Sequence, residues 1–177
     1  WPPSSITHLG VDFGPGSYTG LRVGVVTVKM FAYVTNAKVV AVDAMTLLAT
    51  GSPTSARSIH TIVDAQQNQI YARQFRRDDS TTMPIPVDET QVMPADVWAK
   101  RLHEGDYVTG PGLARFAHLI PEGIRSAAPG QWSPTVDAML GEILRRAAGD
   151  QWDDPWKLHP LYLRDSSAQI RWDAKIG

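Results

Sequence analysis

The residue types that could support catalysis are a serine in a glycine-rich loop, an aspartate between two strand-like runs and a few scattered histidines. The serine, Ser17, follows Gly14-Pro15-Gly16. A nucleophilic serine on a strand-to-helix elbow needs one glycine two residues before it and another two residues after it. Pro15 and Thr19 occupy these two positions. The loop therefore does not predict a serine nucleophile.

The same loop also departs from the glycine signatures of nucleotide sites. A dinucleotide-binding loop would need its third glycine where Thr19 stands, and Gly20 comes one residue too late. A P-loop would need Gly-Lys-Ser or Gly-Lys-Thr, which is absent. Glycines at such a junction can still bring backbone N–H groups close to an anion or to neighbouring backbone. Two interpretations stay open, a structural turn and a site for an anion or a partner, and in both Ser17 or Thr19 can cap the next helix.

The histidines do not form a helical metal pair. Two histidines four residues apart would share one helix face, and no such spacing occurs here. Asp64 follows a strand-like run, where an aspartate commonly bonds the backbone of a turn. We expect no metal site and no catalytic residue, with a Ser, His, Asp triad assembled across the fold as the alternative. The histidines are His8, His60, His103, His118 and His159.

A helix is predicted directly after the loop, over residues 20–35, and it is apolar around most of its circumference. At about 100° per residue, Arg22, Lys29 and Tyr33 fall on one narrow polar stripe. The apolar arc is wider than one sheet face can cover. One flank consists of Leu21, Val25, Val28 and Ala32 and is expected to pack on the chain's own sheet. The other flank, Val23, Val26, Met30 and Val34, predicts a helical interface with a partner.

The remaining pattern predicts an α/β protein in two parts. Strands are expected over 6–13 and 39–42, with a short helix over 44–49 that Asp43 can cap. The polar, proline-containing stretch 51–55 predicts a boundary, which gives an N-terminal lobe over 1–54 and a C-terminal lobe with its tail over 55–177. The second part is expected to contain a hairpin (58–63 and 70–75), a polar excursion (76–94), a helix (97–103), a strand (107–109), a helical stretch to 119, a strand (124–127) and an amphipathic helix (135–148).

That last helix is predicted to be amphipathic, because its six apolar residues share one face while Glu142, Arg145 and Arg146 lie on the other. The six are Val136, Met139, Leu140, Ile143, Leu144 and Ala147.

Composition excludes several classes of protein. The chain of 177 residues has 17 basic and 18 acidic residues and a net charge of -1, so it lacks the basic character of a domain that binds nucleic acid strongly by itself. It contains no cysteine, which excludes disulfides and thiolate chemistry. No apolar run approaches the length of a membrane span and the first residues are not a signal peptide, so we expect a cytoplasmic protein without membrane attachment.

Three stretches carry a resemblance to a known family. The loop and helix start, Gly14-Pro15-Gly16-Ser17-Tyr18-Thr19-Gly20-Leu21-Arg22-Val23-Gly24, resembles the signature of the bacterial TsaB (YeaZ) family, which usually has Phe where Tyr18 stands. Val63-Asp64-Ala65 followed by Ile70-Tyr71-Ala72 resembles the central hairpin of the family. The stretch 160–164, Pro-Leu-Tyr-Leu-Arg, resembles its Pro-x-Tyr-Leu-Arg tail.

The resemblance implies an actin-like, Hsp70-like (ribonuclease H-like) two-lobe fold. Family members normally begin with a strand carrying an Asp-Thr-Ser type motif, a hairpin and a long helix, none of which precedes Trp1 here. The N-terminal lobe is therefore expected to be incomplete in this chain. Catalytic TsaD-type relatives hold a metal with a histidine pair, and this sequence has no such pair.

The resemblance further implies a non-catalytic subunit that pairs with TsaD and, with TsaE, takes part in forming threonylcarbamoyladenosine next to the anticodon of tRNA. ATP and metal are then expected on the partner subunits, with tRNA bound only through the complex. A homodimer is a possible state in the absence of TsaD. The alternatives are a nucleotide-binding ATPase or kinase of the same superfamily and a glycoprotease-like peptidase.

Overall fold

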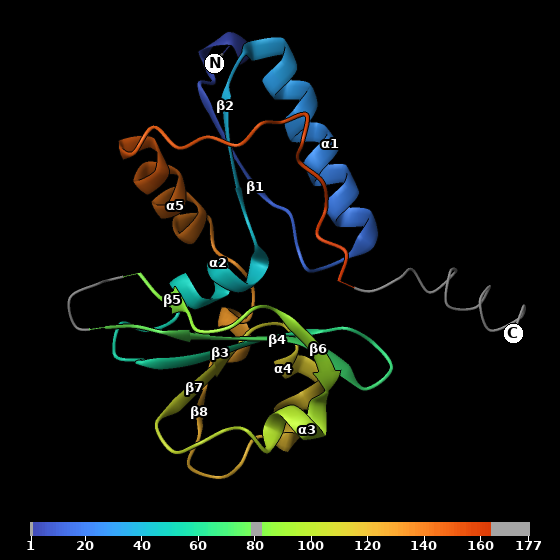
Figure 1. Cartoon of the computed structure of the whole chain (residues 1–177), viewed down its shortest axis with the longest axis vertical. Helices are drawn as coiled ribbons and strands as arrows, with labels where there is room; N and C mark the ends of the chain where they lie inside the picture. Colours follow the sequence, from blue (N-terminus) through green and yellow to red (C-terminus); the bar gives the residue numbers. More distant parts are fainter. Residues whose placement is uncertain (1, 79–82, 164–177) are drawn as a thin grey trace, which may run out of the picture.

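The computed structural model describes residues 2–78 and 83–163 and contains two β-sheets (Figure 1). The first sheet has two parallel strands, β1 (His8–Asp12) and β2 (Lys38–Val42). Helix α1 (Tyr18–Thr35) connects them on one side of this sheet, and α5 (Val136–Ala148) lies on the other side (Figure 1). A strand–helix–strand connection of this kind joins parallel strands, which is the pairing that the sequence predicts.

The second sheet has six strands in the order β5-β4-β3-β7-β8, and β6 also pairs with β4. The pairs that include β7 are parallel, whereas β4 is antiparallel to each of its three neighbours. The strands are β3 (Ser58–Asp64), β4 (Gln69–Arg76), β5 (Ile85–Pro86), β6 (Gln91–Pro94), β7 (Asp106–Thr109) and β8 (Arg125–Ser126).

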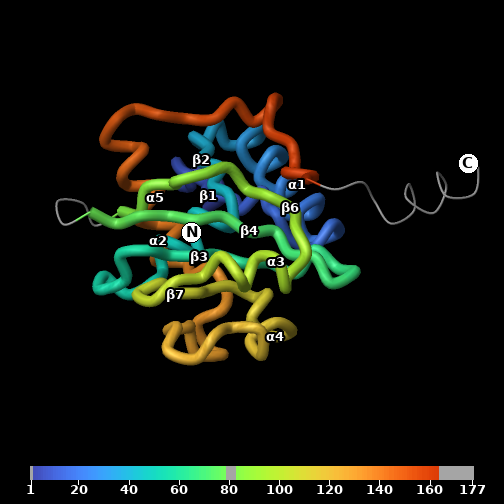
Figure 2. Tube along the Cα trace, turned by 60° about the horizontal axis from the view of Figure 1, so that its bottom comes forward, coloured from blue at the N-terminus to red at the C-terminus, as the bar shows by residue number. Residues whose placement is uncertain are grey.

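Short helices surround the second sheet. Helix α2 (Ala44–Thr50) lies between the two sheets, and α3 (Ala95–Ala99) and α4 (Leu113–Phe116) lie on the far side of the second sheet, as Figures 1 and 2 show. Single turns of 3-10 helix lie at Pro3–Ser5, Ala117–Leu119 and Pro129–Gln131.

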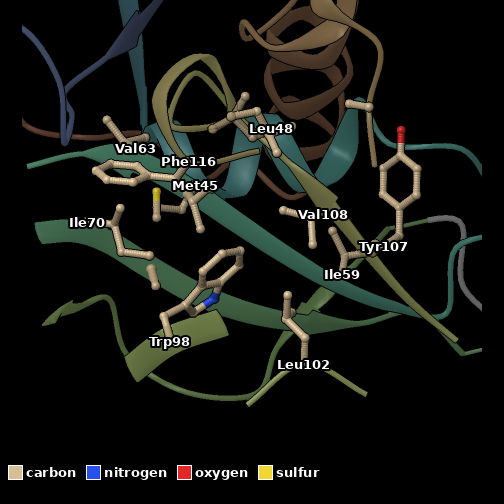
Figure 3. Packing of buried hydrophobic residues seen from close by; sticks show 14 of the residues in the cluster. Met45, Leu48, Ile59, Val63, Ile70, Trp98, Leu102, Tyr107, Val108 and Phe116 are labelled. Atoms are coloured by element: carbon tan, nitrogen blue, oxygen red, sulfur yellow. The ribbon is translucent and has the colours of Figure 1, made fainter. Parts of the chain in front are cut away.

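The largest hydrophobic core belongs to the second sheet (Figure 3). Met45 and Leu48 reach it from α2, Trp98 from α3 and Phe116 from α4. Two smaller clusters flank the first sheet. One lies against α1 and contains Val11, Val25, Ala32, Val39 and Leu158, and the other lies against α2 and α5 and contains Val40, Val42, Leu47 and Ala138.

Most elements agree with the sequence prediction, and two segments differ. The stretch 76–94, predicted as a polar excursion or edge segment, contributes β5 and β6 to the second sheet. The helix predicted over 97–103 begins earlier, at Ala95, and ends at Ala99.

The residues between the sheets, 51–55, lie where the boundary is predicted, but the later part of the chain returns to the first sheet through α5. The division at residues 54 and 55 stays a prediction.

The predicted helix over 135–148 is confirmed as α5, and it buries its apolar face only in part. Met139 and Ile143 of that face pack against the cluster on the first sheet, whereas Val136 (83%), Leu140 (49%) and Leu144 (61%) are exposed. Ala138 and Glu142 are buried, although Glu142 belongs to the polar side. Arg145 pairs with the Glu142 carboxylate, with its Nη2 2.8 Å from Oε2.

Helix α5 packs closely against β1. A Cβ at Gly10 would lie 2.7 Å from atoms of Met139 and Ile143, so the glycine leaves room for these two side chains of the apolar face against the strand. Arg146 adds a bond from Nη1 to the backbone oxygen of Ala41, 3.2 Å long. Neither contact can be recognised from the periodicity of α5 alone.

In the part of the chain that the structure describes, no helix is both long enough and apolar enough to cross a membrane.

Candidate partner-binding helix and its glycine loop

The glycine loop is built into the interior of the protein. Gly14 is buried and adopts a φ of +111°, a conformation that favours glycine. Its N–H donates to Oδ1 of Asp12 (2.8 Å), and its carbonyl oxygen accepts a bond from the N–H of Ala44 (2.8 Å). A Cβ at Gly14 would lie 2.8 Å from Cδ1 of Leu21. The first glycine therefore joins β1, α1 and α2 by close backbone packing.

Asp12 sits at the end of β1 beside this turn. Burial raises the pKa of its carboxyl group, the bond from the Gly14 N–H lowers it, and the charge of Asp43 raises it further. The net effect is a pKa above the ordinary value for aspartate. Asp12 is the last residue of β1 and Asp43 directly follows β2, so both lie at the carboxyl ends of parallel strands, where ligand sites of α/β proteins commonly lie.

Ser17 acts as the helix cap, as predicted. Its Oγ accepts a bond from the N–H of Gly20 at 3.4 Å. Within the described residues, the Ser17 hydroxyl is bonded to this backbone group and not to a histidine or a carboxylate. The second half of the loop is on the surface, since all residues from Gly16 to Gly20 are exposed.

Helix α1 buries one side and exposes the other. Leu21, Val25 and Ala32 face the sheet and are at most 8% exposed. The flank predicted to bind a partner points away from the sheet, and its exposed fractions are 62% for Val23, 57% for Val26, 59% for Met30 and 72% for Val34. Phe31, at 41%, extends this surface. Large apolar surfaces of this kind commonly mark interaction sites.

The C-terminal tail is fastened to the start of α1, a contact that the sequence analysis did not find. Tyr162 accepts a hydrogen bond from Nε of Arg22 (3.0 Å) and packs against Tyr18, with the ring centroids 5.0 Å apart. The guanidinium of Arg22 lies 4.0 Å from the Tyr18 ring centroid. The N–H of Leu161 donates to the carbonyl oxygen of Phe13 (2.7 Å). Two of the three stretches that carry the family resemblance therefore touch each other.

Further along α1, the polar stripe also meets the tail. Tyr33 makes an edge contact with Trp156, at 5.8 Å between centroids. Leu158 inserts into the small core between α1 and the sheet. The stripe of Arg22, Lys29 and Tyr33 therefore faces the tail, which leaves the exposed apolar flank on a separate side of the helix. Arg164 of the predicted tail motif lies outside the described residues.

Among residues 2–78 and 83–163, no three histidine, aspartate or glutamate side chains gather as a metal site. Asp64 has the turn role that was predicted, because its Oδ1 accepts a bond from the N–H of Gln66 (2.7 Å). Its Oδ2 also lies 3.5 Å from Nη1 of Arg115.

Comparison with known proteins decides the family. Residues 1–118 match the family model described as TsaD, tRNA N6-adenosine threonylcarbamoyltransferase. The chain belongs to this family. Its resemblance to the TsaB (YeaZ) members is confirmed by a relative from Bacillus subtilis, the tRNA threonylcarbamoyladenosine biosynthesis protein TsaB. The two are 28% identical over 179 residues, covering 96% of this chain and 75% of the relative.

Two solved structures from Pseudomonas aeruginosa have the same fold as this TsaB-like chain. One, described as an uncharacterized protein with similarity to peptidase YEAZ, has a TM-score of 0.76 at 18% identity and covers 92% of this chain and 76% of its own. The other, YeaZ, has a TM-score of 0.74 at 17% identity, with coverages of 90% and 76%. The predicted actin-like, ribonuclease H-like α/β class is confirmed.

Proposed function

We propose that this chain is a non-catalytic subunit that pairs with a TsaD-like catalytic subunit in the biosynthesis of threonylcarbamoyladenosine in tRNA. The family match and the TsaB relative support the pathway. The observation that carries the role within it is the exposed flank of α1, because a helix that leaves Val23, Met30 and Val34 open to water is suited to bind another helix.

The remaining parts of the proposal follow from this role. The glycine loop acts as the structural start of α1 and takes no part in chemistry, in keeping with the capping role of Ser17. A TsaE-like ATPase joins the complex, the tRNA is contacted through the complex, and ATP and metal are held by the partner subunits. The setting is the cytoplasm.

The test places a charge in the centre of the exposed flank. Met30→Asp should leave the circular dichroism spectrum native, because the side chain is exposed in this chain. Binding to the TsaD-like subunit should weaken by about 2 kcal/mol or more, roughly thirtyfold in Kd, since a buried unpaired charge is strongly unfavourable. Isothermal titration calorimetry and size-exclusion chromatography measure this loss.

The matched control is Lys29→Asp, which puts the same residue on the neighbouring polar stripe facing the tail. Its affinity for the partner should stay close to that of the natural chain. Undiminished affinity of the Met30→Asp protein would show that this flank is not the interface. A second copy of the chain on the same flank would appear as a homodimer that the same substitution dissociates.

The ATPase alternative is separated by a direct measurement. Calorimetric titration of the isolated chain with ATP and Mg²⁺ should give no binding in the proposed role, whereas a nucleotide-binding ATPase would bind.

A further inference from the structure

Helix α2 is held at both ends by arginines, one in a strand of the second sheet and one directly after that strand. It follows β2 of the first sheet, leads into β3 of the second, and packs between the two sheets (Figure 1). Its side chains join both lobes, because Met45 and Leu48 belong to the core of the second sheet and Leu47 to a cluster on the first. The position of α2 therefore determines how the two sheets lie relative to each other.

At the start of α2, Asp43 makes the contact with the second sheet. It caps the helix through its two oxygens, which accept bonds from the N–H (2.9 Å) and the hydroxyl (2.7 Å) of Thr46. Arg73 of β4 places Nη1 3.6 Å from Oδ1 of Asp43. Both side chains are less than one fifth exposed, so water and salt screen this pair weakly.

Arg73 is itself fixed in place. Its Nε donates to the carbonyl oxygen of Asp88 (2.9 Å), and its guanidinium carbon lies 5.2 Å from the ring centroid of Phe75. A held guanidinium loses less conformational freedom on pairing than a free one.

At the end of α2, Arg77, the residue directly after β4, makes the second contact. Only 3% of Arg77 is exposed, and burial lowers its pKa, as does the nearby charge of Arg57. Its Nη2 donates to the carbonyl oxygens of Ala49 (3.3 Å) and Ser52 (3.4 Å), and its Nη1 donates to those of Pro53 and Ala56. The carbonyl groups at a helix C-terminus carry partial negative charge, which a guanidinium stabilises.

The spacing of the two arginines matches the length of the helix. Arg73 and Phe75 lie on one face of β4 because side chains alternate along a strand, and Arg77 directly follows the end of this strand. Four residues of strand span about 13 Å, and the seven residues of α2 span about 10 Å before the cap is added. Arg76 points to the opposite face and is exposed, paired with Asp78.

We propose that Arg73 and Arg77 are positioning residues that clamp α2 and thereby fix the orientation of the first sheet, with α1 on it, relative to the second. The clamp concerns the geometry of the chain by itself. The proposal does not depend on which protein covers the exposed flank of α1.

The experiment measures the distance between the two sheets in solution. The chain has no cysteine, so Thr27→Cys on α1 and Asp96→Cys on α3 introduce two unique labelling sites, both at exposed positions. Double electron–electron resonance between spin labels at these sites gives the distribution of distances. Arg73→Met and Arg77→Met should each broaden and shift this distribution. Arg76→Met, on the same strand, should leave it unchanged.

A conservative variant keeps the test decisive if a methionine variant fails to fold. Asp43→Asn retains an oxygen for the Thr46 cap and removes the charge that faces Arg73, so it should broaden the distribution as Arg73→Met does. Distributions identical to that of Arg76→Met would overturn the clamp, even if the thermal midpoint falls, because the arginines would then only stabilise the fold. The outcome does not depend on partner binding, which the Met30→Asp experiment tests separately.

Discussion

At the scale of single residues, the end of β1 combines a buried acid with a backbone turn. Asp12 accepts the N–H of Gly14, yet its pKa is raised because burial and Asp43 together outweigh this bond. A raised pKa means that the folded state binds the proton of this carboxyl group more tightly than the unfolded state does. Stability is then lost as the pH rises from the ordinary value near 3.8 through the folded-state value.

Asp12→Asn should therefore stabilise the protein at neutral pH. The amide oxygen can still accept the Gly14 N–H, and the cost of the buried charge disappears. The difference in free energy of unfolding between variant and natural chain should grow as the pH rises above 3.8 and vanish below it. Urea unfolding across this pH range measures it.

The control for this prediction is Asp64→Asn. Asp64 also accepts a turn N–H, but its carboxylate faces Arg115, so the substitution should give no gain. The prediction is contradicted if the natural chain is as stable as Asp12→Asn at pH 7, or more stable. The fold would then stabilise the charged Asp12 carboxylate instead of destabilising it.

Ser17→Ala tests the structural interpretation of the loop. It should lower the free energy of unfolding by about 0.5–2 kcal/mol, the usual cost of a lost N-cap, with Thr19→Ala as the milder control. Modification of tRNA by the reconstituted complex should persist. Complete loss of modification with a folded, partner-bound Ser17→Ala protein would contradict the non-catalytic role.

At the scale of elements, the tail and α1 stabilise each other. Tyr162→Ala removes the ring that packs against Tyr18 and the oxygen that Arg22 contacts, with an expected cost of about 1–2 kcal/mol. Lys157 is exposed, but Leu158 after it is buried. Trypsin should therefore cleave after Lys157 faster once the tail is released.

Tyr162→Phe is the matched control, because it keeps the ring and loses only the hydrogen bond from Arg22. Its cleavage rate should fall between those of the natural chain and Tyr162→Ala. An unchanged rate for Tyr162→Ala would mean that Leu158 and the Leu161 backbone bond hold the tail without the aromatic contact.

Local signals explain what the sequence could predict about these elements. Asp43 and Ser17 precede apolar helical patterns and cap α2 and α1, as expected. The close contact of α5 with β1 could not be predicted, because it depends on the missing side chain of Gly10 on another element. Similarly, the sequence places Arg77 in a polar stretch, and only the fold shows that this arginine is buried.

At the scale of the whole molecule, the sequence predicts the order of elements better than their assembly. The α/β class and the exposed flank of α1 follow from periodicity. The clamp on α2 and the contact between tail and loop do not, because each joins residues far apart in the chain, such as Arg22 and Tyr162. Family resemblance identifies the segments that meet but not the bonds between them.

The unequal sizes of the hydrophobic clusters have a consequence for how the protein unfolds. Of the residues that the structure describes, twenty buried ones form the cluster of the second sheet, whereas five and four form the clusters on the two sides of the first sheet. Small clusters around a two-stranded sheet support little cooperativity of their own. In mild denaturant, the amides of β1 and β2 should exchange with deuterium through a partial unfolding reaction. Those of β3, β4 and β7 should exchange only when the entire chain unfolds. The surface that we propose to bind the partner then lies on the less stable cooperative unit, and binding at α1 should raise the free energy of that partial unfolding first.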